Sequence, residues 1–276
     1  MPSTVAEIAA VAESLWPAAG AESWDAVGLV SGDPAASATR VLLAVDAVAA
    51  TVDEAIELGA DLLLTHHPLL LRGVTSVAAD RYKGALVARL IRGGCALLTA
   101  HTNADVVAAG TSAVLAERLG LAGLEPIAPD AVGGGIGRVG ELAEPTTLGR
   151  FARLVAGALP PTAGGVRVSG DYDQPVRRVA VCGGAGDTFL ASPAVLGADV
   201  YVTADLRHHP AQEAREQALL GGGPALLDVS HWASEWLWLA VAAEALRAAL
   251  PDVEILVSEL RTDPWDFAVL SGGQGA

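Results

Sequence analysis

The sequence predicts an α/β protein of two similar domains, in which helices pack on mostly parallel sheets. Short runs of buried-strand character, such as Asp61 to Thr65, alternate with segments of helical periodicity along the chain. The short connections of these strand–helix–strand units favour parallel pairing. Clusters of glycine and proline near 126–137 and 221–224 act as boundaries. They predict a first domain of residues 1–126 plus 225–276, with a second domain of residues 127–224 inserted between its two parts.

The first half of the chain contains a helix followed by three strand–helix units. Thr4 and Glu7 form a capping box, which predicts a helix that Pro17 ends. Thr51 and Glu54 form a second capping box, so we expect another helix to begin there. The predicted strands are residues 40–45, 61–65 and 95–100, and the predicted helices are 4–16, 51–58, 82–91 and 111–119.

The second half continues the same alternation. We expect strands near 136–142, 165–169, 177–182 and 199–203, and helices near 147–158, 188–196 and 210–220. After the second glycine cluster, Ala225 to Val229 is a predicted strand and Ser230 a predicted N-cap. A helix from His231 to Ala249 and a last strand from Val253 to Val257 complete the chain.

Composition excludes several classes of function. The net charge is −15 and the 17 Lys and Arg residues form no cluster, which argues against a nucleic-acid partner. Cys95 and Cys182 lie in predicted strands and fit neither a disulfide framework nor a zinc spacing, so we expect buried thiols in a reducing compartment. The N-terminus lacks a basic start, and no apolar run reaches the roughly 18–20 residues of a membrane span. We therefore expect a soluble, cytoplasmic protein with no membrane partner.

Four of the six histidines follow predicted strands. His66 and His67 come directly after one strand, His101 follows another, and His231 follows a third. In parallel sheets, ligand sites gather beyond the carboxyl ends of the strands. We therefore expect these imidazoles along one edge of one sheet.

Carboxylates accompany these histidines, with Asp105 four residues after His101 and Glu235 four residues after His231. Imidazole and carboxylate together suit zinc, manganese or iron. Five side chains exceed one open tetrahedral site but suit two divalent ions: His66, His67, Asp105, His231 and Glu235. Glu235 would bridge the ions, and His101 would orient Asp105 or a bound water. The alternative is that these are hydrogen-bonded loop histidines and that His231 and Glu235 form a surface pair.

Two further loops carry open alternatives. His208 and His209 follow a predicted strand that ends near Asp205, and they either belong to a solvated loop or contact a substrate. The glycine loop after Cys182 could hold a phosphate through its backbone N–H groups, but it lacks the Lys-Ser/Thr of a P-loop. A tight turn with close packing is the simpler interpretation of this loop.

Taken in chain order, these motifs resemble one known family. The blocks are Trp24-Asp25-x-x-Gly28-Leu29, Leu64-Thr65-His66-His67-Pro68, His101-Thr102-Asn103-x-Asp105, Gly137-Arg138-x-Gly140-Glu141-Leu142, Cys182-Gly183-Gly184, Thr203-x-Asp205 with His209, and His231-x-x-x-Glu235. Their order resembles the GTP cyclohydrolase I type 2 homologues, the NIF-three-like dinuclear metal proteins, over nearly the whole chain. One departure is Ala26, where the family usually has Asn.

The resemblance implies two α/β domains with the metal site at the strand carboxyl ends, in the cleft between the domains. It implies a toroidal homohexamer and a dinuclear centre that uses the same five ligands, with His101 as an accompanying histidine. The middle segment has no room for the extra domain that some members insert. Asn103, Asp205 and His209 are the residues that we expect to contact the substrate.

The activity implied is hydrolysis, in which a metal-bridging hydroxide opens the guanine imidazole ring of GTP with release of formate. Glu235 and His101 would be the catalytic residues, with His101 assisting proton transfer or orientation. A nucleotide partner is compatible with an acidic protein, because two divalent ions reverse the local sign of the charge. The alternatives are phosphoester or amide cleavage on another substrate, and a non-catalytic hexameric scaffold or metal-delivery protein.

Overall fold

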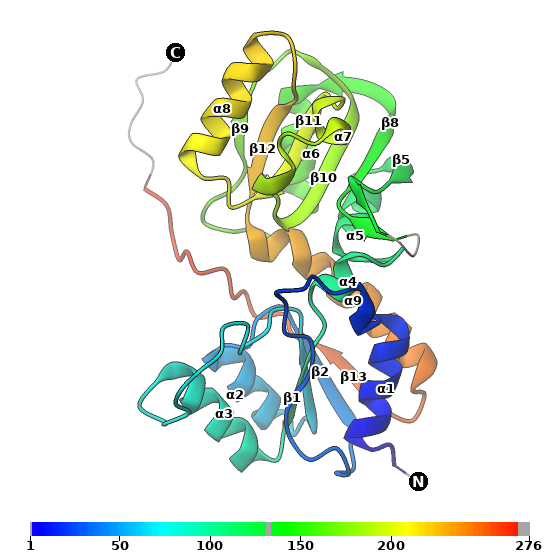
Figure 1. Cartoon of the computed structure of the whole chain (residues 1–276), viewed down its shortest axis with the longest axis vertical. Coiled ribbons are helices and arrows are strands. Elements are labelled where there is room, and N and C mark those ends of the chain that lie inside the picture. Colours follow the sequence, from blue (N-terminus) through cyan, green and yellow to red (C-terminus); the bar gives the residue numbers. More distant parts are fainter. Residues whose placement is uncertain (1, 131–133, 270–276) are drawn as a thin grey trace. The chain divides into compact units, whose positions relative to one another are not determined.

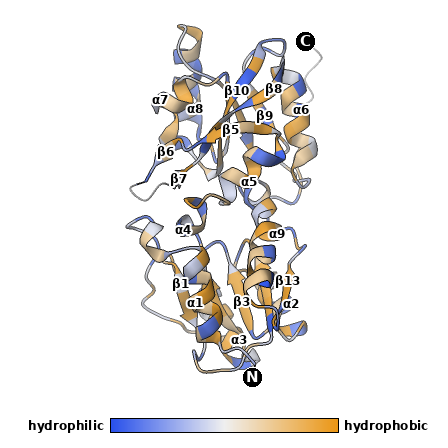
Figure 2. Cartoon of the chain, turned by 90° about the vertical axis from the view of Figure 1, so that its right-hand side faces the viewer, coloured by the Kyte–Doolittle hydropathy of each residue, from blue (hydrophilic) through white to orange (hydrophobic). Residues whose placement is uncertain are grey.

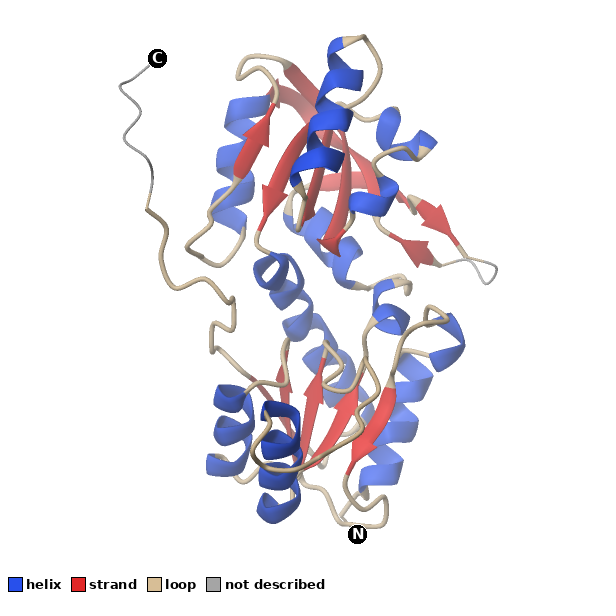
Figure 3. Cartoon of the chain, turned by 60° about the vertical axis from the view of Figure 1, so that its left-hand side comes forward, coloured by secondary structure: helices blue, strands red, loops and turns tan. Residues whose placement is uncertain are grey.

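The computed structural model describes residues 2–130 and 134–269, which divide into two compact units (Figure 1). Unit 1 consists of Met1–Val114, Ala128–Ile136 and Trp236–Thr262. Unit 2 consists of Leu115–Ile127, Gly137–Glu235 and Asp263–Ala276. Both units are α/β, so the fold class and the two-part organisation agree with the sequence (Figure 3).

Unit 1 is built on a five-stranded sheet of order β1-β4-β3-β2-β13. Its strands are β1 (Gly28–Ser31), β2 (Arg40–Ala44), β3 (Leu62–Thr65), β4 (Ala96–Thr99) and β13 (Glu254–Val257). The pairings among β13, β2, β3 and β4 are parallel, and β1 is antiparallel to β4. Every residue of β3 and β4 is buried, as expected for parallel strands that are covered on both faces. Figure 2 shows β3 in the hydrophobic colour.

Helices cover both faces of this sheet. Figure 1 shows α2 and α3 on one face and α1 and α9 on the other. The helices of unit 1 are α1 (Val5–Leu15), α2 (Ala49–Glu57), α3 (Tyr82–Gly93), α4 (Thr102–Asp105) and the part of α9 (His231–Ala249) from Trp236 onward, with η1 (Ala18–Gly20) after α1. β6 (Ala128–Pro129) and β7 (Gly135–Ile136) form a small hairpin, and α5 (Thr111–Arg118) runs from unit 1 into unit 2.

The first two helix starts test the capping predictions. At α1 the box is confirmed, because the Thr4 hydroxyl accepts the Glu7 N–H at 3.2 Å and Glu7 accepts the Thr4 N–H at 2.7 Å. The second box is wrong, since α2 begins at Ala49, two residues before Thr51. The Thr51 hydroxyl instead accepts the Val48 N–H at 3.1 Å from within the first turn.

Unit 2 is built on a six-stranded sheet of order β5-β8-β10-β11-β12-β9. Its strands are β5 (Leu121–Glu125), β8 (Arg138–Thr147), β9 (Arg167–Ser169), β10 (Pro175–Ala185), β11 (Val200–Ala204) and β12 (Ala225–Val229). Only the central pairings β10–β11 and β11–β12 are parallel, so this sheet is mixed. In Figure 2, α6 (Leu148–Ala158) lies on the opposite face of the sheet from α7 (Pro193–Leu196) and α8 (His208–Leu219).

Two expectations fail in unit 2. The helix expected at 188–196 is divided into η2 (Asp187–Phe189) and α7, because Ser192 caps a new helix whose first residue is Pro193.

The expectation that three histidine-bearing strands share one sheet is also wrong. β12, which precedes His231, pairs in parallel with β11 in unit 2, whereas β3 and β4 belong to unit 1. A buried apolar run identifies a strand but carries no information on its partner.

None of the helices in the described residues is long and apolar enough to cross a membrane.

We predict that both thiols resist alkylation in the native protein. Cys95 and Cys182 are each about 2% exposed, and burial raises the pKa of Cys95 to about 12. Because the thiolate is the nucleophile, Cys95 is almost entirely unreactive at pH 8. Mass spectrometry after iodoacetamide treatment at pH 8 should find no adduct on the folded protein and two adducts after guanidine unfolding. Rapid double modification of the folded protein would contradict this burial.

Candidate metal centre

His66 is placed by the parallel ladder at the end of β3. Its backbone N–H continues the ladder by donating to the Ala44 carbonyl at 3.1 Å. The side chain is buried, and its Nδ1 lies 2.9 Å from the Ala100 carbonyl oxygen. A carbonyl can only accept, so Nδ1 carries the proton and Nε2 carries the lone pair. His66 therefore presents Nε2 in the form that binds metal ions.

His67 is oriented by a carboxylate at the end of the neighbouring strand. Its Nδ1 lies 2.7 Å from Asp46 Oδ1, and the other oxygen of Asp46 accepts a hydrogen bond from the Thr262 hydroxyl. Asp46 follows β2 just as His67 follows β3, so the parallel register brings the two side chains together. This carboxylate–imidazole pair is the arrangement that fixes the tautomer of metal-binding histidines.

His101 is held in the same way by Asp25. Its Nδ1 lies 2.9 Å from Asp25 Oδ1, and the Thr102 N–H donates to the other oxygen of Asp25 at 3.0 Å. Burial alone would raise the pKa of Asp25, but the hydrogen bonds from Thr102 and His101 outweigh it and lower that pKa. Burial and the neighbouring His66 lower the pKa of His101, although Asp25 acts in the opposite direction. His101 is therefore neutral at pH 7.

The three imidazoles of unit 1 form one cluster, which we call the histidine cluster: His66, His67 and His101. Their ring centroids lie 5.1, 5.2 and 5.6 Å apart, and one ring nitrogen from each falls within 4.8 Å of the others. Asp105 Oδ1 lies 3.7 Å from His66 Nε2, and the Thr111 hydroxyl donates to that carboxylate. The expected ligands of unit 1 are therefore together, and His101 lies among them rather than behind them.

Unit 2 supplies a second set of donors at the first turn of α9. His231 Nδ1 lies 2.7 Å from Asp205 Oδ2, and His231 Nε2 lies 3.1 Å from Glu235 Oε1. Burial disfavours the charged imidazolium, but the carboxylates of Glu235 and Asp205 outweigh it and raise the pKa of His231 to about 11. Two anionic groups therefore converge on one imidazole, and Glu235 is itself buried.

A glycine makes room for this pair. Gly184 has φ of +68°, a backbone conformation that residues other than glycine rarely adopt. A Cβ at this position would collide with Glu235 Oε1 and would lie 3.1 Å from His231 Nε2. The Gly184 N–H donates to the Ser234 hydroxyl at 2.9 Å, which ties the glycine loop to α9. The close packing agrees with the simpler interpretation, but the expected turn is wrong, because residues 183–185 form the end of β10 with an irregular register.

The donor set fits divalent metal ions. In all four histidines, Nδ1 faces an oxygen of the backbone or of a carboxylate, so Nε2 is the nitrogen that would face a metal ion; in His231 the ion would replace the proton that Glu235 and Asp205 stabilise. Neutral imidazole combined with carboxylate is the chemistry that zinc, manganese and iron prefer. The sequence did not single out Asp46 and Asp25 as partners of His67 and His101. Asp46 carried a usable signal, because it stands directly after a strand.

The residues expected to contact substrate have other contacts. Asn103 is buried, its amide donates to the Trp16 carbonyl at 2.7 Å, and its oxygen accepts the His101 N–H at 2.8 Å. Asp205 is bonded to His231, as described above. His208 and His209 are exposed at the start of α8, with ring centroids 5.2 Å apart. Substrate contact stays a prediction for Asn103, Asp205 and His209, while the structure shows Asn103 holding its loop.

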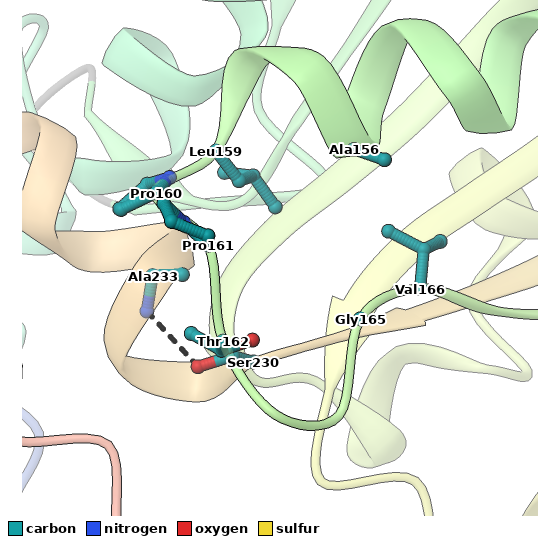
Figure 4. Close-up of a pocket in the computed structure, with 9 residues that line it drawn as sticks. All are labelled: Ala156, Leu159, Pro160, Pro161, Thr162, Gly165, Val166, Ser230 and Ala233. Carbon is teal, nitrogen blue, oxygen red and sulfur yellow. Dashed lines mark hydrogen bonds between the residues drawn. The ribbon is translucent and has the colours of Figure 1, made fainter. Parts of the chain in front are cut away.

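A cavity of about 210 Å³ lies in unit 2, and its lining includes none of these histidines or carboxylates (Figure 4). Its walls are mainly apolar and include Leu159, Pro160 and Val166, and it reaches Ser230, which caps α9 by accepting the Ala233 N–H at 3.2 Å. Ligand pockets usually measure about 300–1,000 Å³ and carry convergent polar groups. This cavity is too small and too apolar to hold a nucleotide.

Comparison with known proteins gives one consistent result. The model of the Duf34/NIF3 (NGG1p interacting factor 3) family matches residues 3–264. A Streptomyces coelicolor protein named GTP cyclohydrolase 1 type 2 homolog is 48% identical over 97% of this chain and 95% of its own length. A Clostridium perfringens protein of the same name is 34% identical over 95% and 98% of the two chains.

Solved structures agree with the sequence relatives. A Bacillus cereus protein related to NIF3 has a TM-score of 0.88 at 26% identity, covering 97% of this chain and all of that one. A Staphylococcus aureus hypothetical protein has a TM-score of 0.87 at 29% identity, with the same coverage. The likeness therefore extends over both units.

Two glycine substitutions should have opposite effects on stability. Gly184→Ala should lower the free energy of unfolding by more than about 1 kcal/mol, because it combines a positive φ with a collision at Glu235. Gly157→Ala is the control, since Gly157 lies inside α6 with no atom near its Cβ position. It should raise stability by about 0.5–1 kcal/mol. Urea unfolding measures both, and equal effects would contradict the close packing at Gly184.

Proposed function

This chain belongs to the Duf34/NIF3 family, and on that basis we propose that it is a metal-dependent hydrolase with a dinuclear centre. The ligands that we propose for two divalent ions are His66, His67, Asp105, His231 and Glu235. The observation that carries the proposal is the common orientation of the imidazoles: in each, Nδ1 lies at an oxygen acceptor, so Nε2 is the nitrogen that would coordinate a metal ion.

The helix α9 carries residues of both units, because it begins in unit 2 and continues into unit 1 from Trp236. Trp238 lies on α9, and its indole packs on the His66 ring with centroids 5.4 Å apart. Residues three and seven positions apart lie on one face of an α-helix. Glu235 and His231 stand three and seven residues before Trp238, so these three side chains leave α9 from one face.

The residues of the chain have distinct roles in this proposal. Two bound divalent ions would lower the pKa of water towards neutrality and make the carbon or phosphorus atom that is attacked more electrophilic. Glu235 is rigid and buried on α9, and we assign it as the bridging ligand. The carboxylates of Asp46 and Asp205 lie at Nδ1 of His67 and His231, which would leave Nε2 of each ring to coordinate an ion. His101 is neutral near pH 7 and can accept a proton from water at the cluster.

The substrate that we propose to test first is GTP, with opening of the guanine imidazole ring and release of formate. Support for this choice comes from the relatives, which are named GTP cyclohydrolase 1 type 2 homolog. The triphosphate would face a centre whose ions offset the charge of its carboxylates. Other nucleotides and phosphodiesters form the rest of the panel.

We predict that Glu235→Gln loses metal and turnover together. The amide removes the negative charge of the proposed bridge, so metal content after reconstitution with zinc, manganese or iron should fall from two ions per chain to one or none. Turnover of the GTP panel should fall about 10²–10⁴-fold, as expected when a group that acts in the chemical step is lost. Elemental analysis and formate or phosphate release measure the two quantities.

Glu244→Gln is the matched control, because Glu244 lies on the same helix but is exposed and pairs with Arg247. It should keep both ions and full turnover. If Glu235→Gln keeps two ions, the ligand assignment is wrong. If the wild-type protein binds two ions and turns over no member of the panel, the hydrolase proposal fails and a metal-binding scaffold takes its place.

A further inference from the structure

Trp24 is an exposed aromatic side chain beside the histidine cluster, and the mechanism above does not use it. Its exposed fraction is 58%, which is high for the largest apolar side chain. Its indole meets the His101 ring edge-on, with centroids 6.0 Å apart and planes at 75°. His101 is in turn 5.2 Å from His66 and 5.6 Å from His67 between ring centroids.

The loop that carries Trp24 is held firmly on both sides. One residue later, Asp25 bonds to His101 and to Thr102, and its side chain has no exposed surface. Two residues earlier, the Glu22 N–H donates to the Thr102 hydroxyl at 2.9 Å, and the Asp25 N–H donates to the Glu22 carbonyl at 2.9 Å. Trp24 is therefore displayed on a fixed turn whose anchors are the residues that orient His101.

An exposed indole on an anchored turn, at the rim of a polar cluster, is suited to stacking on a planar ring. Aromatic side chains bind planar rings through their faces, and preorganisation removes the entropy cost of ordering them. Stacking of a base on an aromatic side chain is sequence-tolerant, because every base has a π-face. The indole would stack on the face of the ring, while the cluster would meet the edge of the ring that reacts.

We propose that Trp24 is the specificity-determining residue of the site and stacks on the planar heterocycle of the substrate. This inference rests on the proposed function, since it takes the histidine cluster as the place of reaction. It assigns the Trp24-Asp25 motif two coupled roles. Asp25 orients His101, and Trp24 selects ligands that carry a flat aromatic ring over ligands that carry only phosphate.

The test compares the affinities of two probes for the metal-loaded protein by calorimetry. The probes are 7-deaza-GTP, whose five-membered ring cannot be opened by hydrolysis, and inorganic triphosphate, which has no base. The wild-type protein should bind 7-deaza-GTP more tightly than triphosphate. Trp24→Ala should weaken 7-deaza-GTP binding about 5- to 150-fold, the equivalent of about 1–3 kcal/mol, and leave triphosphate binding unchanged.

Two further variants separate stacking from a structural role. Trp24→Phe keeps an aromatic face and should recover most of the affinity for 7-deaza-GTP. Trp265→Ala is the control, because Trp265 is 69% exposed in unit 2, and it should change neither affinity. Metal content and oligomeric state, measured by elemental analysis and light scattering, should be the same in all three variants and the wild type.

Several outcomes would overturn the inference. One is that the wild type binds both probes with equal affinity. Another is that Trp24→Ala binds 7-deaza-GTP as tightly as the wild type does. A third is that Trp24→Ala changes the oligomeric state but keeps the preference for the probe that carries a base. The proposed function is tested separately, because it is measured by turnover. If the wild type shows the Trp24-dependent preference but does not hydrolyse GTP, the stacking role stands and the GTP reaction fails.

Discussion

The hydrogen bond from each imidazole Nδ1 to an oxygen acceptor is the constraint on which the candidate site depends. Ala100, Asp46, Asp25 and Asp205 supply these acceptors for the four histidines. Without them, each ring could rotate and exchange tautomers, and the donor atoms would point in no common direction. Because Asp25 and Ala100 are buried, and Asp46 is itself hydrogen-bonded to Thr262, the anchors are fixed by the fold.

The fold places these anchors through the registers of its strands and the length of one helix. β2, β3 and β4 run in parallel and in register, so the residues that follow them, Asp46, His66 with His67, and His101, leave the sheet at one edge. α9 is 19 residues long; His231 and Glu235 lie near its start, and Trp238 contacts both Trp16 and His66. The helix α9 therefore begins directly after β12 in unit 2 and continues into unit 1.

Much of this was predictable from the sequence, because it depends on local pattern. Apolar runs predict the two strands that stop before His66 and His101, and they predict the helix from His231 to Ala249. Residue spacing led to the five proposed ligands. The partner of each strand is a tertiary property, so the sequence placed β12 in the wrong sheet. The anchors Asp25 and Asp46 lie 76 and 21 residues from the histidines that they hold, and no local pattern links them. The start of α2 was missed because Thr51 also caps from inside a first turn.

The most direct test of the central claim is anomalous diffraction from crystals soaked in zinc and recorded at the zinc absorption edge. The account predicts two peaks per chain within about 2.0–2.2 Å of imidazole Nε2 atoms of His66, His67 and His231, with Nδ1 still on Ala100, Asp46 and Asp205. Peaks at Nδ1 atoms, or strong peaks only at sites away from the histidine cluster and Glu235, would contradict it.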